Sequence, residues 1–235
     1  MNESAKDFFD QESNRYDAFV KGRDFVPALK EKVNPILRGR VLDVGSGCIN
    51  DFREGSFDSY IAMDLSFGMV SGIEQGGRVK AVCGDATALP FQDNTFDIIL
   101  YRAVLHHLNP EGKRPRKMEE ILKNVLAEAR RLLTKDGRVL VIEPCLPRLL
   151  EGFERVFSSV IRCVMRVFGL PYVFLFSRRG LERLLRTGEW SALEVDLVQG
   201  TGKRWEWIAP ILGLPFIKIP RWASPSRIYL FQGRR

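Results

Sequence analysis

The sequence predicts an α/β protein built on a doubly wound, mostly parallel sheet. The first observation is that short apolar runs rich in β-branched residues alternate with helical stretches along the first 143 residues. Strands and helices that alternate in this way are typical of parallel sheets with helices on both faces. The second observation is a glycine loop, residues 45–47, directly after the first apolar run. Doubly wound sheets bind nucleotides at such loops.

Seven strands and two long helices follow from these patterns. The expected strands lie at about 40–44, 60–64, 79–83, 96–101, 138–143, 193–198 and 227–232, and the last two should pair antiparallel. A helix over 3–32 is expected because aromatic residues recur there on a charged background. A second helix over about 116–134 should end at Lys-Asp-Gly, residues 135–137, whose glycine suits a left-handed C-cap.

The segment from residue 147 to residue 176 departs from this alternation. Polar and charged residues recur in it three or four apart, at Arg148, Glu151, Arg155, Ser159, Arg162 and Arg166. Large apolar residues fill the intervening positions, which predicts an amphipathic helix with a narrow basic stripe and a wide apolar face. Further apolar runs follow at 172–176 and 205–214. Together these segments either form a lid, line a lipophilic pocket, contact a membrane surface or form a dimer interface.

The glycine loop has the features of a nucleotide pocket. Gly45 and Gly47 allow a tight turn and a close approach of the backbone to a ligand. Asp43 lies two residues before the first glycine, and Asp64 ends the next apolar run. A carboxylate at the latter place is expected to bind a ribose in a dinucleotide-type fold.

The residues after the loop indicate which nucleotide it binds. A dinucleotide needs a third glycine and an open helix N-terminus for its pyrophosphate. Here the third position is Asn50, and the acids Asp51 and Glu54 follow it. S-adenosylmethionine has no phosphate, and its amino group could bind to Asp43. The loop therefore favours S-adenosylmethionine.

Four motifs extend this interpretation. They are Val-Leu-Asp-Val-Gly-Ser-Gly at 41–47, Met-Asp-Leu-Ser at 63–66, Gly-Asp-Ala-Thr-Ala-Leu-Pro-Phe at 84–91, and a run at 96–108 that contains Leu-His-His-Leu. In this order and spacing they resemble the class I S-adenosylmethionine-dependent methyltransferases, in particular the type 11 group typified by ubiquinone and menaquinone biosynthesis enzymes. The resemblance covers about residues 40–143. It implies a Rossmann-like, seven-stranded sheet that the antiparallel C-terminal strand closes.

The resemblance also implies the residues that bind S-adenosyl-L-methionine. They are Tyr16, Asp43, Gly45, Ser46, Gly47, Asp64, Leu65, Asp85, Ala86 and Arg102. Asp43 and the glycines would surround the methionine moiety, Asp64 would hold the ribose, and Leu65, Asp85 and Ala86 would contact the adenine. Cys48 and Ile49 depart from the family pattern.

Three residues are candidate catalysts. Methyl transfer from a sulfonium needs mainly alignment and exclusion of water, and an acceptor hydroxyl also benefits from a general base. His106, His107 and Glu143 are expected just beyond the ends of the fourth and fifth strands, where sites of α/β proteins open. The two histidines are the only ones in the chain. The alternative is that they only shape the pocket.

The acceptor is less defined than the methyl donor. Residues 144–235 carry 15 Lys and Arg against 7 Asp and Glu, so the whole basic excess of the net charge of +7 lies there. With the apolar segments, this favours a lipophilic small-molecule acceptor, such as a quinone or lipid, with peripheral membrane contact. The alternative is an RNA (tRNA) methyltransferase that uses the basic C-terminal part, with nucleic acid the less favoured partner. A non-catalytic binding module is the third class.

The chain is expected to form one domain of 235 residues. Its parts would be an N-terminal helical cover over 1–37, a cofactor-binding core over 38–146, an amphipathic lid insertion over 147–180, and a C-terminal helix with the closing strands over 181–235. Its four cysteines lack metal-ligand spacing, so no metal site and mostly buried, reduced thiols are expected. We expect a cytoplasmic protein, a monomer or homodimer, since no signal peptide or membrane span is evident.

Overall fold

The computed structural model describes residues 10, 25–48, 52, 56–108, 115–167, 172–198, 205–207, 218–220 and 226–235. Tyr16, most of the helix expected over 3–32 and most of the apolar run 205–214 lie outside these residues.

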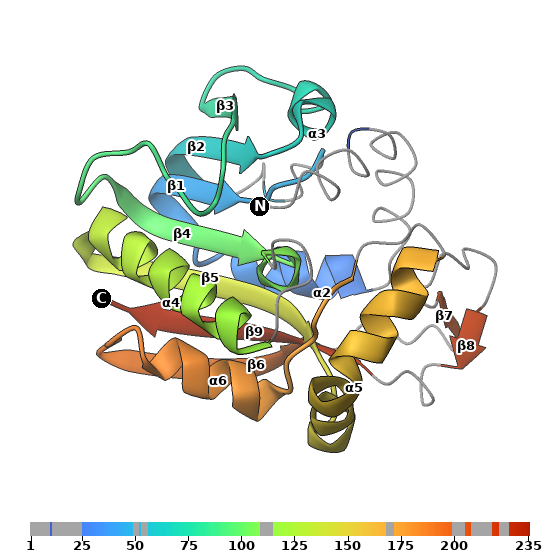
Figure 1. The fold of residues 1–235 in the computed structure, drawn as a ribbon. Helices are drawn as coiled ribbons and strands as arrows, with labels where there is room; N and C mark the ends of the chain where they lie inside the picture. The colour runs from blue at the N-terminus through green and yellow to red at the C-terminus, as the bar shows by residue number, and fades with distance from the viewer. Residues whose placement is uncertain are drawn as a thin grey trace.

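The centre of the molecule is a seven-stranded sheet with the order β3-β2-β1-β4-β5-β9-β6 (Figure 1). Its strands are β1 (Arg38–Val44), β2 (Ser56–Asp64), β3 (Val79–Cys83), β4 (Phe96–Arg102), β5 (Leu133–Cys145), β6 (Ala192–Val198) and β9 (Arg227–Arg234). The first five pair parallel, and β9 pairs antiparallel with both β5 and β6. The predicted fold class and the antiparallel closure are confirmed. The short strands β7 (Trp205–Trp207) and β8 (Lys218–Pro220) pair separately.

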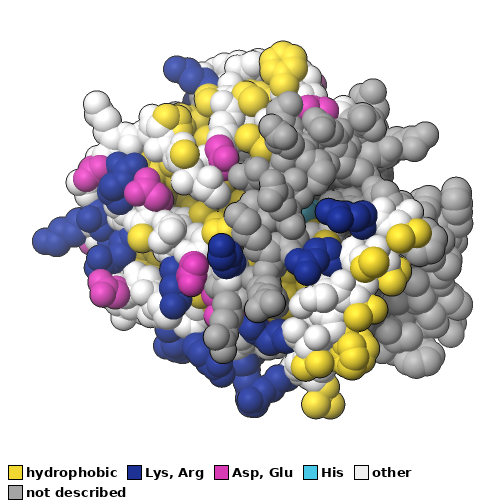
Figure 2. All heavy atoms as spheres, in the orientation of Figure 1, with side chains coloured by type: hydrophobic (Ala, Val, Ile, Leu, Met, Phe, Trp, Pro, Cys, Tyr) yellow, Lys and Arg dark blue, Asp and Glu magenta, His cyan; other side chains and the backbone are white. Residues whose placement is uncertain are grey.

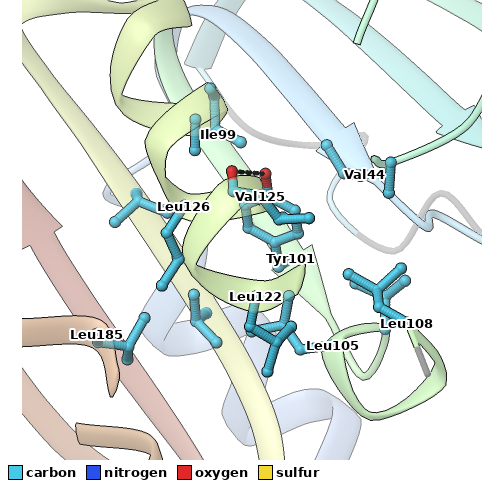
Figure 3. Close-up of a cluster of buried hydrophobic side chains, with 14 of the residues drawn as sticks. Val44, Ile99, Tyr101, Leu105, Leu108, Leu122, Val125, Leu126 and Leu185 are labelled. Carbon is cyan, nitrogen blue, oxygen red and sulfur yellow. Dashed lines mark hydrogen bonds between the residues drawn. The ribbon is translucent and has the colours of Figure 1, made fainter. Parts of the chain in front are cut away.

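Helices cover both faces of this sheet, as Figure 1 shows. They are α2 (Phe25–Val33), α3 (Phe67–Ser71), α4 (Pro115–Leu132), α5 (Arg148–Val167) and α6 (Arg178–Arg186), with a 3-10 turn, η1 (Leu105–His107). Two buried clusters result, one with α4 and α6 and the other with α2. In the first cluster, Leu122, Val125 and Leu126 of α4 lie over Tyr101 of β4 (Figure 3). None of the helices described here is long and apolar enough to cross a membrane.

The start of β5 corrects the predicted end of the preceding helix. The helix α4 ends at Leu132, and β5 begins at Leu133. Leu133 pairs with Phe96 and Arg138 pairs with Ile98, so residues 134–137 bulge out of the ladder. Gly137 is not among the residues with positive φ. A Cβ on it would lie 2.9 Å from the Thr134 carbonyl oxygen, so glycine serves a close approach and not the predicted left-handed cap.

Polar contacts attach α5 to the rest of the protein. The buried carboxylate of Glu151 accepts hydrogen bonds from the Ser177 N–H (3.1 Å) and from Arg155 (2.7 Å). Arg155 also pairs with Glu119 of α4 (2.8 Å). Burial, and to a smaller degree Glu151, raises the pKa of Glu154 to about 7, although the Leu175 backbone and Arg155 act in the opposite direction. The face of α5 that contacts the protein is therefore its charged face.

Shortening Leu126 tests the packing of α4. Leu126 is buried in the larger cluster, so Leu126→Ala should lower the free energy of unfolding by about 2–5 kcal/mol through lost burial and a residual cavity. Urea denaturation measures this. Lys123→Ala, on the exposed side of the same helix, should change it by less than about 0.5 kcal/mol. Equal effects of the two substitutions would contradict the described orientation of α4.

The raised pKa of Glu154 predicts a pH dependence of stability. Because its folded pKa of about 7 exceeds the ordinary value of 4.5, the folded state binds the proton more tightly, and stability falls as pH rises between these values. Glu154→Gln should remove this fall, about 1–3 kcal/mol between pH 4.5 and pH 8. Urea denaturation at both pH values measures it. Glu194→Gln, a carboxylate 60% exposed on β6, removes the same charge and should not reproduce the effect.

Candidate active site

Most of the expected site residues that the structure describes lie at or near the carboxyl ends of the parallel strands. In the sheet order, β1 lies beside β4, and the chain leaves these two strands toward opposite halves of the sheet. This is the topological switch point at which open α/β sheets bind ligands. The glycine loop follows β1, and the loop with both histidines follows β4.

The glycine loop is held against β2 and against the loop after β4. Gly45 and Gly47 have φ angles of 71° and 64°, which are strained for any residue with a side chain. The N–H groups of Gly45 and Ser46 donate to the Met63 carbonyl oxygen (2.7 and 3.0 Å). A Cβ on Gly45 would lie 2.3 Å from a methyl of Val104. Both conformation and space therefore require glycine at position 45.

Asp64 connects this loop to the end of β2. Its Oδ2 accepts a hydrogen bond from the Gly47 N–H (3.0 Å) and its Oδ1 from the Ser66 N–H (2.9 Å). Burial raises the pKa of Asp64, although these backbone donors oppose the shift. Asp10, from the N-terminal region, accepts from the Ser66 hydroxyl and from the Gly68 N–H (3.2 Å). No pattern in the sequence predicted Asp10 at this place.

Asp43 and Arg102 act beneath the loop. Asp43 is fully buried, and the Tyr60 hydroxyl donates to its Oδ2 (2.6 Å). Arg102 donates to the Ser46 carbonyl oxygen (2.9 Å), and its guanidinium lies over the Phe52 ring, 5.5 Å from the centroid. We find Asp43 inside the sheet and Arg102 as a support of the glycine loop.

Asp85, Ala86 and Leu65 lie at the adjoining strand ends. Asp85 follows β3 and accepts from both the N–H and the hydroxyl of Thr87 (2.8 Å each). These hydrogen bonds lower the pKa of Asp85 although partial burial opposes them. Ala86 is buried, and Leu65 is half-buried directly after Asp64. The structure thus places the three expected adenine-binding residues in the two loops after β2 and β3.

Glu143 and His106 form a buried pair. The Glu143 Oε1 accepts from the N–H groups of Val104 (2.9 Å) and Leu105 (2.7 Å), and its Oε2 lies 2.6 Å from the His106 Nδ1. A carboxylate acceptor at Nδ1 assigns the proton to that nitrogen and leaves Nε2 able to accept another. Glu143 itself lies inside β5, paired with Tyr229 of β9, not beyond the strand end as predicted, because β5 continues to Cys145.

The second histidine has a different environment. The ring centroids of His106 and His107 are 4.1 Å apart. Burial, with a further contribution from His106, lowers the pKa of His107 well below its usual value. His107 is therefore neutral at pH 7. The nearby thiol of Cys145 is also uncharged, since burial raises its pKa, whereas Cys83 and Cys163 are exposed, which corrects the expectation of mostly buried thiols.

Val104 joins the two halves of the site. Its N–H binds Glu143, and its side chain occupies the space above Gly45. The sequence did not single out Val104. Tyr60 was missed as well, although its pairing with Val41 puts it on the same face of the sheet as Asp43. Beside the pair of Glu143 and His106 is a narrow crevice without room for a water molecule, whose walls are Leu105, His106, Glu143, Pro144, Phe176 and Leu181.

The chemistry of these groups fits S-adenosylmethionine. Asp64 and Asp85 present carboxylate oxygens at neighbouring strand ends, and such acceptors suit ribose hydroxyls and an adenine amino group.

Comparisons with known proteins agree with the fold. The family described as "Methyltransferase domain" matches residues 42–141. The demethylmenaquinone methyltransferase of Renibacterium salmoninarum is 32% identical over 108 residues, 44% of this chain and 40% of the relative. That of Clavibacter sepedonicus is 27% identical over 175 residues, 68% of this chain and 66% of the relative. The chain thus spans less than two thirds of either relative.

A solved structure extends the likeness of fold to the whole chain. This chain is similar to a Haloferax volcanii protein solved in complex with the Trm112 methyltransferase activator, with a TM-score of 0.67 and 15% sequence identity. The match covers 97% of this chain and 96% of the Haloferax chain. Sheet order, glycine loop and strand-end acids define a class I methyltransferase fold. Within that class, residues 42–141 match the Methyltransferase domain family, which supports an S-adenosylmethionine-dependent methyltransferase of the type 11 group.

Gly45→Ala tests the glycine loop. The left-handed φ and the contact with Val104 should displace the loop and weaken S-adenosylmethionine binding at least tenfold, which isothermal titration calorimetry measures. Gly152→Ala is the matched control, since a Cβ there meets nothing within 4 Å. It should leave the affinity unchanged and raise stability by about 0.5–1 kcal/mol. Unchanged binding by Gly45→Ala would exclude this loop as the cofactor site.

Proposed function

We propose that the protein transfers a methyl group from S-adenosylmethionine to a lipophilic small molecule that carries a hydroxyl group, such as a quinol or a lipid. The observation that carries this proposal is the pair of Glu143 and His106. His106 follows Val104 by two residues, and Val104 both binds Glu143 through its N–H and contacts the glycine loop through its side chain. A base beside the methyl donor is the arrangement that an acceptor hydroxyl requires.

The loops after β1, β2 and β3 would hold the cofactor. The Gly45–Gly47 backbone would lie against its methionine part, Asp64 would accept from the ribose hydroxyls, and Asp85 would accept from the adenine amino group. Tyr16, Asp43, Leu65 and Ala86 remain proposed contacts on the strength of the resemblance, and Arg102 supports the loop through Ser46. When bound, S-adenosylmethionine supplies a methyl group already activated by its sulfonium.

His106 would act as the general base and Glu143 as its positioning residue. The Nε2 of His106 would take the proton of the acceptor hydroxyl as that oxygen, or the ring carbon it activates, bonds to the methyl carbon and the methyl–sulfur bond breaks. The Glu143 carboxylate would stabilise the imidazolium that forms, and its two backbone contacts would keep it in place. Neutral His107 would shape the pocket.

Support for a lipophilic acceptor comes from the relatives and from the segment after β5. Two relatives are demethylmenaquinone methyltransferases by name, and menaquinones carry long apolar chains. In this chain α5 begins three residues after Cys145, the end of β5, and carries many exposed apolar side chains. We propose that residues 147–180 form a lid over the acceptor site. The crevice beside His106 is now too narrow to admit an acceptor, and movement of the lid would widen it.

The second candidate is an RNA methyltransferase. The helix α6 supports it with four exposed arginines, Arg178, Arg179, Arg183 and Arg186, which could contact phosphates. Incubation with tritiated S-adenosylmethionine and either a lipid extract or total tRNA distinguishes the two. Label in the lipid fraction supports the first proposal, and label in tRNA replaces it with the second.

Glu143→Gln tests the base. The amide would accept the two backbone N–H groups but donate to the His106 Nδ1, so Nε2 would carry the proton and could not accept another. We expect kcat to fall by about 10²–10⁴ and to lose the pH dependence that the base imposes. Initial rates from pH 5.5 to pH 9 measure this.

Two controls separate catalysis from binding and folding. The affinity of Glu143→Gln for S-adenosylmethionine should stay within about threefold of the wild type, because the Gln oxygen still accepts from the Val104 and Leu105 N–H groups and so keeps Val104 against the glycine loop. His106→Ala should lower kcat to a similar degree. A full rate in His106→Ala would exclude the base, and absence of S-adenosylmethionine binding by the wild type would exclude methyl transfer altogether.

A further inference from the structure

The helix α5 exposes its apolar residues and turns its acids toward the protein. Glu151 is buried and Glu154 and Arg155 are partly buried, whereas most apolar residues of α5 are exposed; Met165, which is buried, and Ile161, which is half-buried, are the exceptions. A surface helix of a globular protein normally packs its apolar stripe on the core. The orientation of α5 is the reverse.

The inward contacts fix this orientation. Glu151 binds the Ser177 N–H and Arg155, and Arg155 reaches Glu119 of α4 at 2.8 Å. Turning α5 to bury its apolar side would break the contacts with Ser177 and Glu119, whereas Glu151 and Arg155 lie on the same helix and would stay paired. The buried Ser177 N–H would then lose its acceptor, and a buried donor without a partner costs free energy.

The outward side chains form a continuous apolar strip. Those most exposed are Leu149 (87%), Phe153 (56%), Val156 (75%), Val160 (60%) and Val167 (77%). The rings of Phe153 and Phe157 lie 4.4 Å apart on it. Figure 2 shows hydrophobic side chains gathered along this helix, at the lower right. A helix of 20 residues is about 30 Å long, and an exposed apolar surface of this extent marks an interaction site.

The charges that border the strip are positive. The exposed charged residues of α5 are Arg148 and Arg166, one at each end of the helix. Arg178 and Arg179, exposed at the start of α6, directly follow Ser177, whose N–H binds Glu151 in the first turn of α5. Because both acids of α5 face inward, its outer side attracts anions.

We propose that α5 lies in the interfacial plane of an anionic lipid bilayer. Its apolar strip enters the boundary between headgroups and acyl chains, and the arginines at its ends contact lipid phosphates. Helices with a large apolar face, aromatic side chains and flanking arginines bind membranes in this way. The helix lies on the membrane and does not cross it, in keeping with the absence of a spanning helix among the residues described.

The other occupants fit less well. Two copies of α5 packed antiparallel would bring Arg148 of one beside Arg166 of the other, and no acid on the outer side of α5 could pair with either. A nucleic acid would meet aliphatic side chains along most of the strip, where it needs cations or stacking platforms. An anionic bilayer offers acyl chains to the apolar strip and phosphates to the arginines.

Docking of α5 on a bilayer adds to the proposed function where the lipophilic acceptor is met, and this part of the inference rests on the proposed function. Glu143 and α5 belong to one continuous stretch of chain, since α5 begins three residues after the end of β5. A protein docked by α5 would therefore hold its acceptor site close to the bilayer, where a lipophilic acceptor is dissolved. Membrane binding itself requires no methyl transfer and can be measured without it.

Cosedimentation with vesicles tests the proposal. The full chain is mixed with vesicles of phosphatidylcholine alone or with 30% phosphatidylglycerol. We expect binding to the anionic vesicles and its release by 0.5 M NaCl. Phe153→Ser should weaken it at least tenfold, because the phenyl ring leaves water on binding, and Arg148→Gln with Arg166→Gln should weaken it about fivefold per charge.

Phe67→Ser is the matched control. Phe67 is 68% exposed on α3, and its loss should change vesicle binding less than twofold. Since Phe153 is exposed, Phe153→Ser should retain the melting temperature and the S-adenosylmethionine affinity of the wild type. Vesicle binding by a wild type that binds no S-adenosylmethionine would uphold this inference and refute the proposed function.

Three results would overturn the inference. The first is equal vesicle binding by the wild type and Phe153→Ser. The second is a dimer in sedimentation equilibrium that Phe153→Ser dissociates, without vesicle binding by either form, which would make α5 an interface between copies. The third is a melting temperature several degrees lower in Phe153→Ser, again without vesicle binding, which would show that the chain itself covers the strip.

Discussion

The buried carboxylate of Glu143 is the interaction on which the rest of the site depends. It lies inside β5 and takes donors from three successive residues, Val104, Leu105 and His106, at 2.9, 2.7 and 2.6 Å. A buried carboxylate that lost these donors would be costly, so the loop after β4 is held to β5. Val104 then closes the space above Gly45. One side chain thus sets the position of the histidine and the shape of the glycine loop.

The sequence allowed the fold and half of the site to be predicted for a physical reason. Apolar runs predict strands, and parallel strands bring their carboxyl ends together, so Gly45, Asp64 and Asp85 had to be neighbours. Features that depend on how distant segments pair with one another could not be predicted in this way. Gly137 follows a helix and looks like a cap, yet β4 draws residues 133–138 into a bulged ladder. The contact of Asp10 with Ser66 joins residues 56 positions apart, and no local pattern announces it.

The structure also separates three catalytic candidates that were equivalent in the sequence. Both carboxylate oxygens of Glu143 already accept hydrogen bonds, so it can orient a base better than it can serve as one. Burial keeps His107 neutral. His106 is the residue whose Nδ1 contacts a carboxylate, an arrangement that fixes the tautomer of the imidazole and orients its Nε2.

The orientation of α5 follows from the same balance between charges and apolar surface. The sequence predicted a helix with an apolar face and a charged face. Periodicity does not say which of them packs on the protein, and hydrophobicity alone would predict the apolar face, whereas the charged face does. Each exposed Phe or Leu forgoes about 1.5–3 kcal/mol of burial, while the contacts of Glu151 with Ser177 and of Arg155 with Glu119 hold the opposite face inward. In water this arrangement leaves apolar surface uncompensated. It becomes favourable when the outer face leaves water, so the polar contacts that fix the helix also keep its apolar strip available for a surface outside the protein.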